Sequence, residues 1–413
     1  MSKGKIPWPA VALLLATTTS GYLCRVNVST AGAMLMNEFS LTQVAMGQIF
    51  SAFLLGYALF QIPSGILADR WGPRRVLAVA TWLWVAITAL QVLVGWGPFQ
   101  TTVSVSIAVF MIFRFLLGIS TSPSYPASAK AVSLWVPTIF QGRSNGIVLA
   151  SVGLGSALAP PLVSYVMIHF GWRLAMIASS LPALAIAFVW LRFPQQTDVV
   201  SKNEIQKRDA EEKKVSLLSP SFILLTISYT LQGYVGYIFV SWFYLYLVQE
   251  RHFSLLSGAW MGSLPWVLSI ISIPLGGLLS DRLTSGRLGP TWGPRIIPII
   301  GMALSGIFIS IGANTESAWI AAISLAFATA FVMCVEGPFW TMMMRISHHR
   351  SGTAGGIMNT GSNVGGLISP TLTPILATYF GWETALHMAS GLAVVAAACW
   401  LGVRSEDSRV IKS

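Results

Sequence analysis

Three charged residues lie inside long apolar stretches, where an ionisable side chain is costly and therefore informative. Arg25 stands in the string YLCRVNVSTA, Arg114 in FRFLLG and Glu336 in CVEGPFW. A guanidinium group presents a planar fork of donors that matches a carboxylate or a phosphate. A glutamate side chain can take up and release a proton. The chemistry that these residues support is therefore recognition of an anion and exchange of a proton.

The composition indicates what surrounds these residues. Of 413 residues, 54% are hydrophobic and 9% are charged, whereas about 25% are charged in an ordinary soluble domain. Apolar stretches of about 20 residues, long enough to cross ~30 Å of hydrocarbon as helix, recur along the whole chain. The predicted spans are 8–36, 46–68, 76–96, 103–128, 143–169, 172–192, 220–248, 256–280, 295–313, 317–344, 353–380 and 383–403. The sequence therefore predicts an all-α membrane protein with twelve transmembrane helices.

The basic residues predict the orientation of these helices. If the N-terminus is cytoplasmic, 21 of the 25 Lys and Arg residues fall on cytoplasmic segments, two on external segments and two at membrane depth. This distribution follows the positive-inside rule, so we expect both termini in the cytoplasm. The formal net charge of +11 then reflects contact with anionic lipid, and a nucleic-acid partner is excluded as an explanation.

The two halves of the chain repeat one another. FGWRLA at 170–175 returns as FGWETA at 380–385, and GILADR at 65–70 returns as GLLSDR at 277–282. Two copies inserted in the same direction produce two six-helix bundles with a cavity between them at the midplane. The predicted domains are an N-terminal bundle at 1–192, a charged cytoplasmic linker at 193–219 and a C-terminal bundle at 220–413.

The string GILADRWGPRR follows the second span and is predicted to be mechanical. Gly65 permits close helix packing, Asp69 can pair with basic groups of the neighbouring bundle, and Arg70 and Arg74 hold the loop in that interface. Asp281 and Arg282 occupy the corresponding places in the second copy. The alternative is a positively charged cytoplasmic loop without a moving role.

This string resembles the signature loop of the major facilitator superfamily, and the twelve spans, the linker and the repeat extend the resemblance over the whole chain. The helix-1 string, together with GYALFQIPSGILADR, SWFYLYLVQERHFS, GPFW and NTGSNVGGLISP, is similar to the anion:cation symporter family of sugar-acid and organic-anion transporters. The resemblance implies a secondary transporter, with the loop after helix 2 acting as a conformational latch.

The family resemblance also implies which residues bind substrate. By this resemblance Arg25 is the anchor for the substrate carboxylate. Arg114 is instead judged by its position, seven residues before Thr121 and so on nearly the same helix face, and it either orients the site, joins a charge network or is structural. An arginine at the centre of a span costs about 2.5–3.5 kcal/mol on insertion scales, so we expect Arg25 to face the cavity with an anionic partner. The remaining predicted substrate contacts are Tyr22, Tyr57, Trp340, Asn359 and Asn363.

The chain departs from the family at the positions associated with proton coupling. The family commonly has an aspartate before the helix-1 arginine and a glutamate in helix 4, where this chain has Cys24 and Thr121. By elimination Glu336, the one acid predicted at membrane depth, is the coupling candidate. Burial would favour its neutral form and a nearby arginine its charged form, so substrate binding to an arginine could free it to take up a proton. Exchange, uniport and sodium coupling are the alternatives.

Several other functions are disfavoured. The sequence has no phosphate-binding loop and no pairing of a nucleophile with a base, so we expect neither an enzyme nor an ATP-driven pump, and no cofactor or metal. An organophosphate:phosphate exchanger would have a further arginine in 220–248, which has none, and Arg25 suits a drug exporter poorly. A membrane sensor that binds without transport remains a hypothesis.

We expect a monomer in a bacterial inner membrane that carries a small organic anion, with a proton or sodium as the coupling ion.

Overall fold

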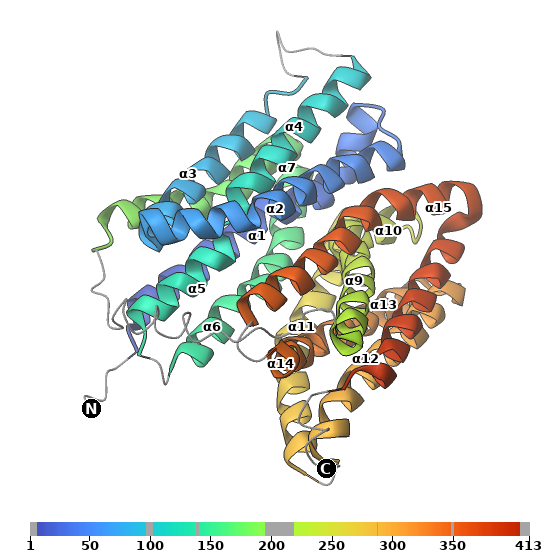
Figure 1. Cartoon of the computed structure of the whole chain (residues 1–413). Coiled ribbons are helices and arrows are strands. Elements are labelled where there is room, and N and C mark those ends of the chain that lie inside the picture. The colour runs from blue at the N-terminus through green and yellow to red at the C-terminus, as the bar shows by residue number, and fades with distance from the viewer. Residues whose placement is uncertain are drawn as a thin grey trace. The chain divides into compact units, whose positions relative to one another are not determined.

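The computed structural model describes residues 6–95, 102–137, 140–194, 219–286, 288–347 and 351–404, which form helices joined by short turns (Figure 1). The helices are α1 (Trp8–Glu38), α2 (Gln43–Trp71), α3 (Pro73–Gln91), α4 (Val103–Thr121), α5 (Ser124–Trp135), α6 (Gln141–Leu149), α7 (Ser151–Arg192), α9 (Pro220–Ser241), α10 (Phe243–Gln249), α11 (Leu255–Ser285), α12 (Gly289–Asn314), α13 (Ala318–Cys334), α14 (Glu336–Ser347) and α15 (Ser351–Gly402).

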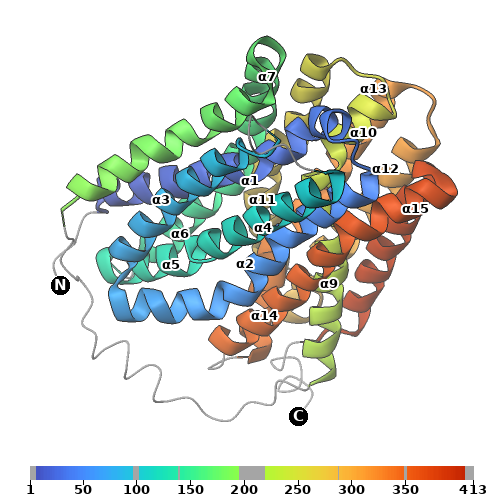
Figure 2. The same ribbon diagram turned by 90° about the horizontal axis from the view of Figure 1, so that it is seen from above.

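The chain forms two compact units. Unit 1 comprises the described residues of Met1–Ala210 together with Ser254–Ser263, and unit 2 those of Glu211–Phe253 together with Leu264–Ser413. Figure 2 shows the helices of each unit from above. The predicted domain boundaries stay a prediction, and most of the predicted linker lies outside the described residues.

Nine described segments are long and apolar enough to cross a membrane. Two of them, Arg143–Arg192 and Ala354–Gly402, contain 50 and 49 residues, far more than the ~20 that one crossing requires. Each is interrupted by a glycine in a left-handed conformation, Gly171 with φ 80° and Gly381 with φ 83°. Each therefore divides into two crossings, and together with α1 the described helices agree with the twelve predicted spans.

The left-handed glycines also show the repeat in three dimensions. Gly171 and Gly381 are the second residues of FGWRLA and FGWETA, so the two copies of this string make the same turn. A residue with a Cβ atom rarely adopts a φ near +80°, which explains why glycine stands at both places.

Four predicted spans, 103–128, 143–169, 220–248 and 317–344, are each built from two helices, and in two of them prolines lie at the break. In the span 103–128, α4 ends at Thr121 and α5 begins at Ser124, where Pro123 and Pro126 interrupt the backbone hydrogen bonds as predicted. In the span 317–344, α13 ends at Cys334 and α14 begins at Glu336. There Pro338 has no N–H to donate to the carbonyl of Cys334.

Close packing at glycines fixes the helices that carry the site in unit 1. A methyl group on Gly118 of α4 would lie 2.1 Å from the carbonyl oxygen of Phe53, and one on Gly56 of α2 would lie 2.2 Å from that of Phe115. Such distances leave no room for a side chain, so the backbones of α2 and α4 are in direct contact. This contact brings Arg114 of α4 toward Phe53.

Candidate functional site

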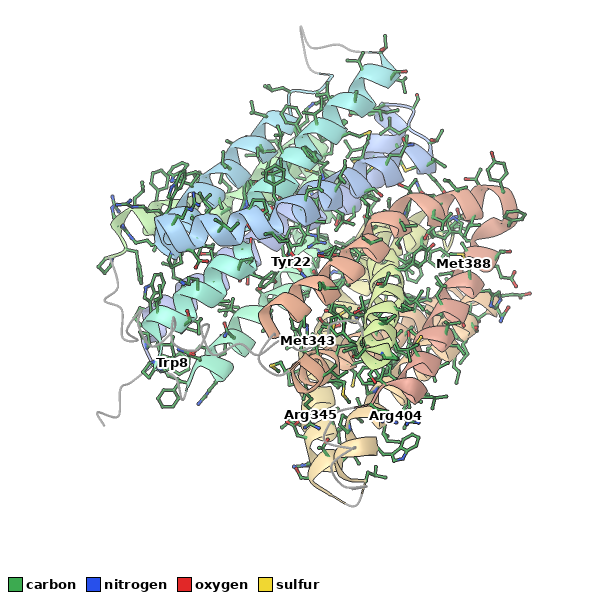
Figure 3. The ribbon with its side chains drawn as sticks, viewed as in Figure 1. Trp8, Tyr22, Met343, Arg345, Met388 and Arg404 are labelled. Atoms are coloured by element: carbon green, nitrogen blue, oxygen red, sulfur yellow. The ribbon has the colours of Figure 1, made fainter. Side chains whose placement is uncertain are left out.

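Aromatic rings surround Arg25 in unit 1. Its guanidinium carbon lies 4.8 Å from the ring centre of Phe53, 5.3 Å from that of Tyr22 and 5.6 Å from that of Tyr57. The hydroxyl of Tyr22, which is labelled in Figure 3, accepts a bond of 3.5 Å from Nη1 of Arg25. Three electron-rich ring faces stabilise a cation at membrane depth and keep its orientation fixed. The structure thus groups the predicted residues Tyr22, Arg25 and Tyr57 into one cluster.

Arg114 does not extend into this cluster in the same way. Its Nη2 donates to the backbone carbonyl of Arg25 at 2.5 Å and its Nη1 to that of Cys24 at 3.4 Å. The side chain is 2% exposed, and its guanidinium carbon lies 5.4 Å from the same Phe53 ring that contacts Arg25. These contacts suit a residue that fixes the helix 1 backbone at Arg25 better than one that touches substrate.

Cys24 and Thr121, which stand where the resemblance predicts coupling carboxylates, both contact backbone carbonyl groups. Cys24 is fully buried, and its Sγ lies 3.8 Å from the carbonyl oxygen of Ser179 in α7. The hydroxyl of Thr121 donates to the carbonyl of Leu117 at 2.6 Å, within its own helix.

Three neutral donors hold the carboxylate of Glu336 in unit 2. Its Oε1 accepts from the hydroxyl of Tyr229 and from Nε1 of Trp340 at 3.1 Å, and its Oε2 accepts from Nε2 of Gln232 at 3.2 Å. All three donors belong to unit 2, since α9 supplies Tyr229 and Gln232 and the first turn of α14 supplies Trp340. Whether an arginine also pairs with Glu336 stays a prediction.

One face of α15 points toward this cluster. A methyl group on Gly355 would lie 3.1 Å from the ring of Trp340, and one on Gly366 would lie 2.5 Å from the ring of Tyr237. Asn359 and Asn363 follow Gly355 at four-residue spacing, so they share its face of the helix. Asn363 is buried and Asn359 is partly exposed.

Three of the predicted latch residues form contacts within unit 1. Asp69 pairs with Lys130 of α5 at 2.8 Å, and Nη2 of Arg74 donates to the carbonyl of Trp190 at 3.3 Å. Gly65 lies against Pro126, whose Cβ would be 3.8 Å from a methyl group there. The remaining predicted latch residues, Arg70, Asp281 and Arg282, are exposed. The described partner of Asp69 thus belongs to its own bundle.

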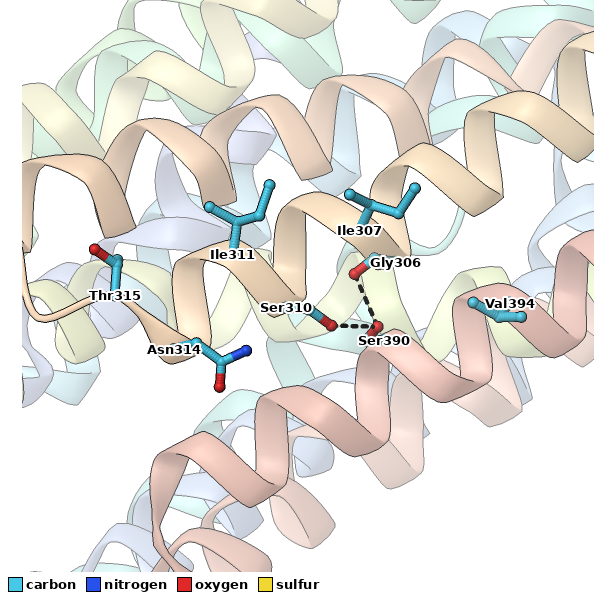
Figure 4. A pocket seen from close by; sticks show the side chains of 8 residues that line it. All are labelled: Gly306, Ile307, Ser310, Ile311, Asn314, Thr315, Ser390 and Val394. Atoms are coloured by element: carbon cyan, nitrogen blue, oxygen red, sulfur yellow. Dashed lines mark hydrogen bonds between the residues drawn. The ribbon is translucent and has the colours of Figure 1, made fainter.

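A pocket of about 620 Å³ opens between α12 and the second part of α15 (Figure 4). The hydroxyl of Ser390 donates to the carbonyl of Gly306 at 2.8 Å and lies 2.9 Å from that of Ser310. The other lining residues are Ile307, Ile311, Asn314, Thr315 and Val394. None of the described residues that line this pocket is charged, so it does not share the chemistry of either cluster.

The sequence interpretation missed Phe53, Tyr229 and Gln232. Phe53 stands four residues before Tyr57 and therefore on the same helix face, a spacing that could have revealed it. Gln232 is a polar residue inside an apolar span, which is itself a signal of function. Tyr229 gave no comparable signal, because a tyrosine within a span is usually packing.

Comparison with known proteins identifies the family. The model of the Major Facilitator Superfamily matches residues 13–370 and 283–413. A probable sulfoacetate transporter of Cupriavidus necator is 30% identical, over 90% of this chain and 87% of its own length. A probable galactarate/D-glucarate transporter of Bacillus subtilis is 27% identical, over 99% and 94%.

Solved structures agree on the fold. A bacterial homolog of the human lysosomal transporter Spinster superposes with a TM-score of 0.78 at 18% identity, covering 97% of both chains. A D-xylose-proton symporter superposes with a TM-score of 0.77 at 15% identity, covering 96% of this chain and 98% of its own.

The chain therefore belongs to the Major Facilitator Superfamily, as its sequence predicts. It is a multi-pass membrane transporter and not an enzyme.

Proposed function

We propose that the protein is a secondary transporter that carries a small organic anion by alternating access. The observation that carries this proposal is Arg25, a cation at membrane depth whose guanidinium is held against the rings of Tyr22, Phe53 and Tyr57. A fixed guanidinium can form two parallel hydrogen bonds with one carboxylate. The carboxylate-bearing substrates named for the relatives from Cupriavidus necator and Bacillus subtilis support the same class.

The substrate that suits this chain is a carboxylate that carries further polar groups, such as a sugar acid, a hydroxy acid or an aromatic acid. Tyrosine hydroxyls and asparagine amides can hydrogen-bond to hydroxyl or sulfonate oxygens, and a tryptophan ring can cover an apolar part. The residues proposed for these contacts are Tyr22, Tyr57, Trp340, Asn359 and Asn363. Arg114 is proposed to orient Arg25 through the helix backbone.

Uptake by the purified protein in proteoliposomes tests this function. The panel consists of sulfoacetate, D-glucarate, galactarate, glucuronate and benzoate as candidate substrates, with glucose 6-phosphate and a lipophilic cation as counter-examples. We expect saturable uptake of at least one carboxylate that is lost in Arg25→Ala. Transport of the phosphate ester alone would indicate an exchanger, transport of the cation alone an exporter, and binding without flux a sensor.

We propose Glu336 as the residue that couples transport to a proton. Among the acids of the described spans, Glu336 is the one predicted at membrane depth. Its hydrogen bonds come from neutral groups, so gaining a proton changes the charge of the whole cluster. Glu336→Gln should abolish accumulation driven by an imposed pH gradient while sparing counterflow, which needs no net proton movement. Accumulation that persists in this variant, or that follows a sodium gradient in the parent, would refute the assignment.

The proposed setting is a bacterial inner membrane, with a monomeric protein and both termini in the cytoplasm. The bacterial relatives support the membrane, and the positive-inside pattern supports the orientation. Protease protection of tags at each terminus in inverted and right-side-out vesicles tests the topology.

A further inference from the structure

The two oxygens of the Glu336 carboxylate have chemically different partners. Oε1 accepts from the hydroxyl of Tyr229 and from the indole N–H of Trp340, whereas Oε2 accepts from the side-chain amide of Gln232. An indole N–H can only donate. A proton placed on Oε1 would face the indole of Trp340, which has no means of accepting it, and the hydroxyl of Tyr229 could accept it only by turning its own hydrogen away from Glu336.

Gln232 differs because a carboxamide carries both a donor and an acceptor. When its side-chain amide turns by half a rotation, Oε1 of Gln232 takes the place of Nε2 and can accept a hydrogen bond. The contact given up is weak, since Nε2 lies 3.5 Å from the carbonyl of Val332. Gln232 is thus able to bind Glu336 in both protonation states.

We propose that Gln232 is the positioning residue that lets Glu336 carry the coupling proton on Oε2. A proton from solution bonds to Oε2, and the resulting O–H donates to Oε1 of the rotated Gln232 amide. Oε1 of Glu336 keeps its bonds from Tyr229 and Trp340. Release reverses these steps, and no other covalent bond is made or broken. This inference rests on the proposed coupling role of Glu336.

The surroundings keep Gln232 in place for this role. It is 4% exposed, and the next residue, Gly233, packs so closely on α15 that a methyl group there would lie 2.4 Å from the carbonyl of Ser362. The titratable neighbours are Tyr229 and the more distant Tyr237 of the same helix, and Cys334 lies two residues before Glu336 in the sequence. Among the described residues of unit 2, no charged group is paired with Glu336, so hydrogen bonds hold its proton.

Infrared spectroscopy of the purified full-length protein tests this arrangement without any substrate. The carboxylic acid band that is absent from Glu336→Gln identifies the protonated side chain. In Gln232→Met the O–H has lost its acceptor, so we expect this band to move to higher wavenumber. In Gln232→His an imidazole can again donate or accept, and the band should return toward its original position. Gln91→Met, a matched change at a buried glutamine of unit 1, should leave the band unchanged.

Transport gives the second reading, with sulfoacetate or D-glucarate as the probe, whichever the parent protein carries. Gln232→Met should reduce accumulation under a pH gradient by about tenfold, because the loss of one hydrogen bond worth ~1.4 kcal/mol corresponds to a factor of about ten. Counterflow should continue. An unmoved band, or full accumulation in a folded Gln232→Met, overturns the role of Gln232. If Glu336→Gln also accumulates normally, the proposed coupling role of Glu336 has failed as well, and the two failures are thereby distinguished.

Discussion

Replacing Arg25 with lysine removes the fork of donors while retaining the positive charge. Both side chains can lie against the rings of Phe53, Tyr22 and Tyr57, which are 4.8 to 5.6 Å from the guanidinium carbon, so the variant should insert and fold. An ammonium group cannot form the two parallel bonds that a guanidinium forms with one carboxylate. The loss of one hydrogen bond to a charged group, worth about 1.5–3 kcal/mol, should weaken anion binding by about 10- to 150-fold.

The assay is isothermal titration of the purified protein with the carboxylate that the uptake panel identifies, followed by uptake at saturating concentration. Arg143 provides a matched control, because it is exposed and its guanidinium carbon lies 5.8 Å from the ring centre of Trp8, away from the site. Arg143→Lys should bind like the parent. Unchanged affinity in a well-folded Arg25→Lys would show that Arg25 does not anchor the anion through its fork.

Three further predictions concern positions around the site. Asp69→Asn removes an ion pair with Lys130 whose carboxylate is 62% exposed, so stability should change by less than ~1 kcal/mol. Cysteine accessibility from the two membrane sides should nevertheless shift, and an unchanged pattern would count against the latch. Gly118→Ala should reduce the yield of folded protein sharply, because its methyl group would lie 2.1 Å from a backbone oxygen, whereas Gly65→Ala has 3.8 Å of clearance and should be tolerated; equal melting temperatures would contradict the described packing. Arg114→Gln should lower substrate affinity and thermal stability together, with partial rescue by Arg114→Lys, and retention of both properties in the glutamine variant would exclude a positioning role.

Much of the fold could be predicted because it depends on composition and repetition. Apolar stretches of span length, the basic residues between them and the two copies of FGW required no knowledge of packing. The break at Pro123 and Pro126 was also predictable, since proline removes a backbone donor. The break before Glu336 was not predicted, although Pro338 carries the same signal, because a single proline often only bends a membrane helix.

The site was less predictable because side-chain direction is not fixed by spacing. Arg114 and Thr121 were expected on nearly one face of their helix, yet the arginine reaches the backbone of α1 and the threonine hydroxyl bonds within its own helix. A nearby arginine was one possible partner for Glu336, and the donors described in unit 2 are Tyr229, Gln232 and Trp340. Hydrogen-bonding side chains can satisfy a carboxylate as fully as a charge does, and the sequence does not indicate which of them reaches it.

The helix breaks at the starts of α5 and α14 lie 212 residues apart, the same interval that separates GILADR from GLLSDR. The two copies therefore share the break, but the first residue of the helix that follows it differs: Ser124 in one copy and Glu336 in the other. A first helical turn favours a negative charge through the helix dipole, so either copy offers a place where an acid is tolerated. In evolutionary terms, an ionisable group at this point can be gained or lost in one half by a single substitution, while the other half retains the inherited scaffold. Relatives with the same fold can in this way differ in the ion that drives them.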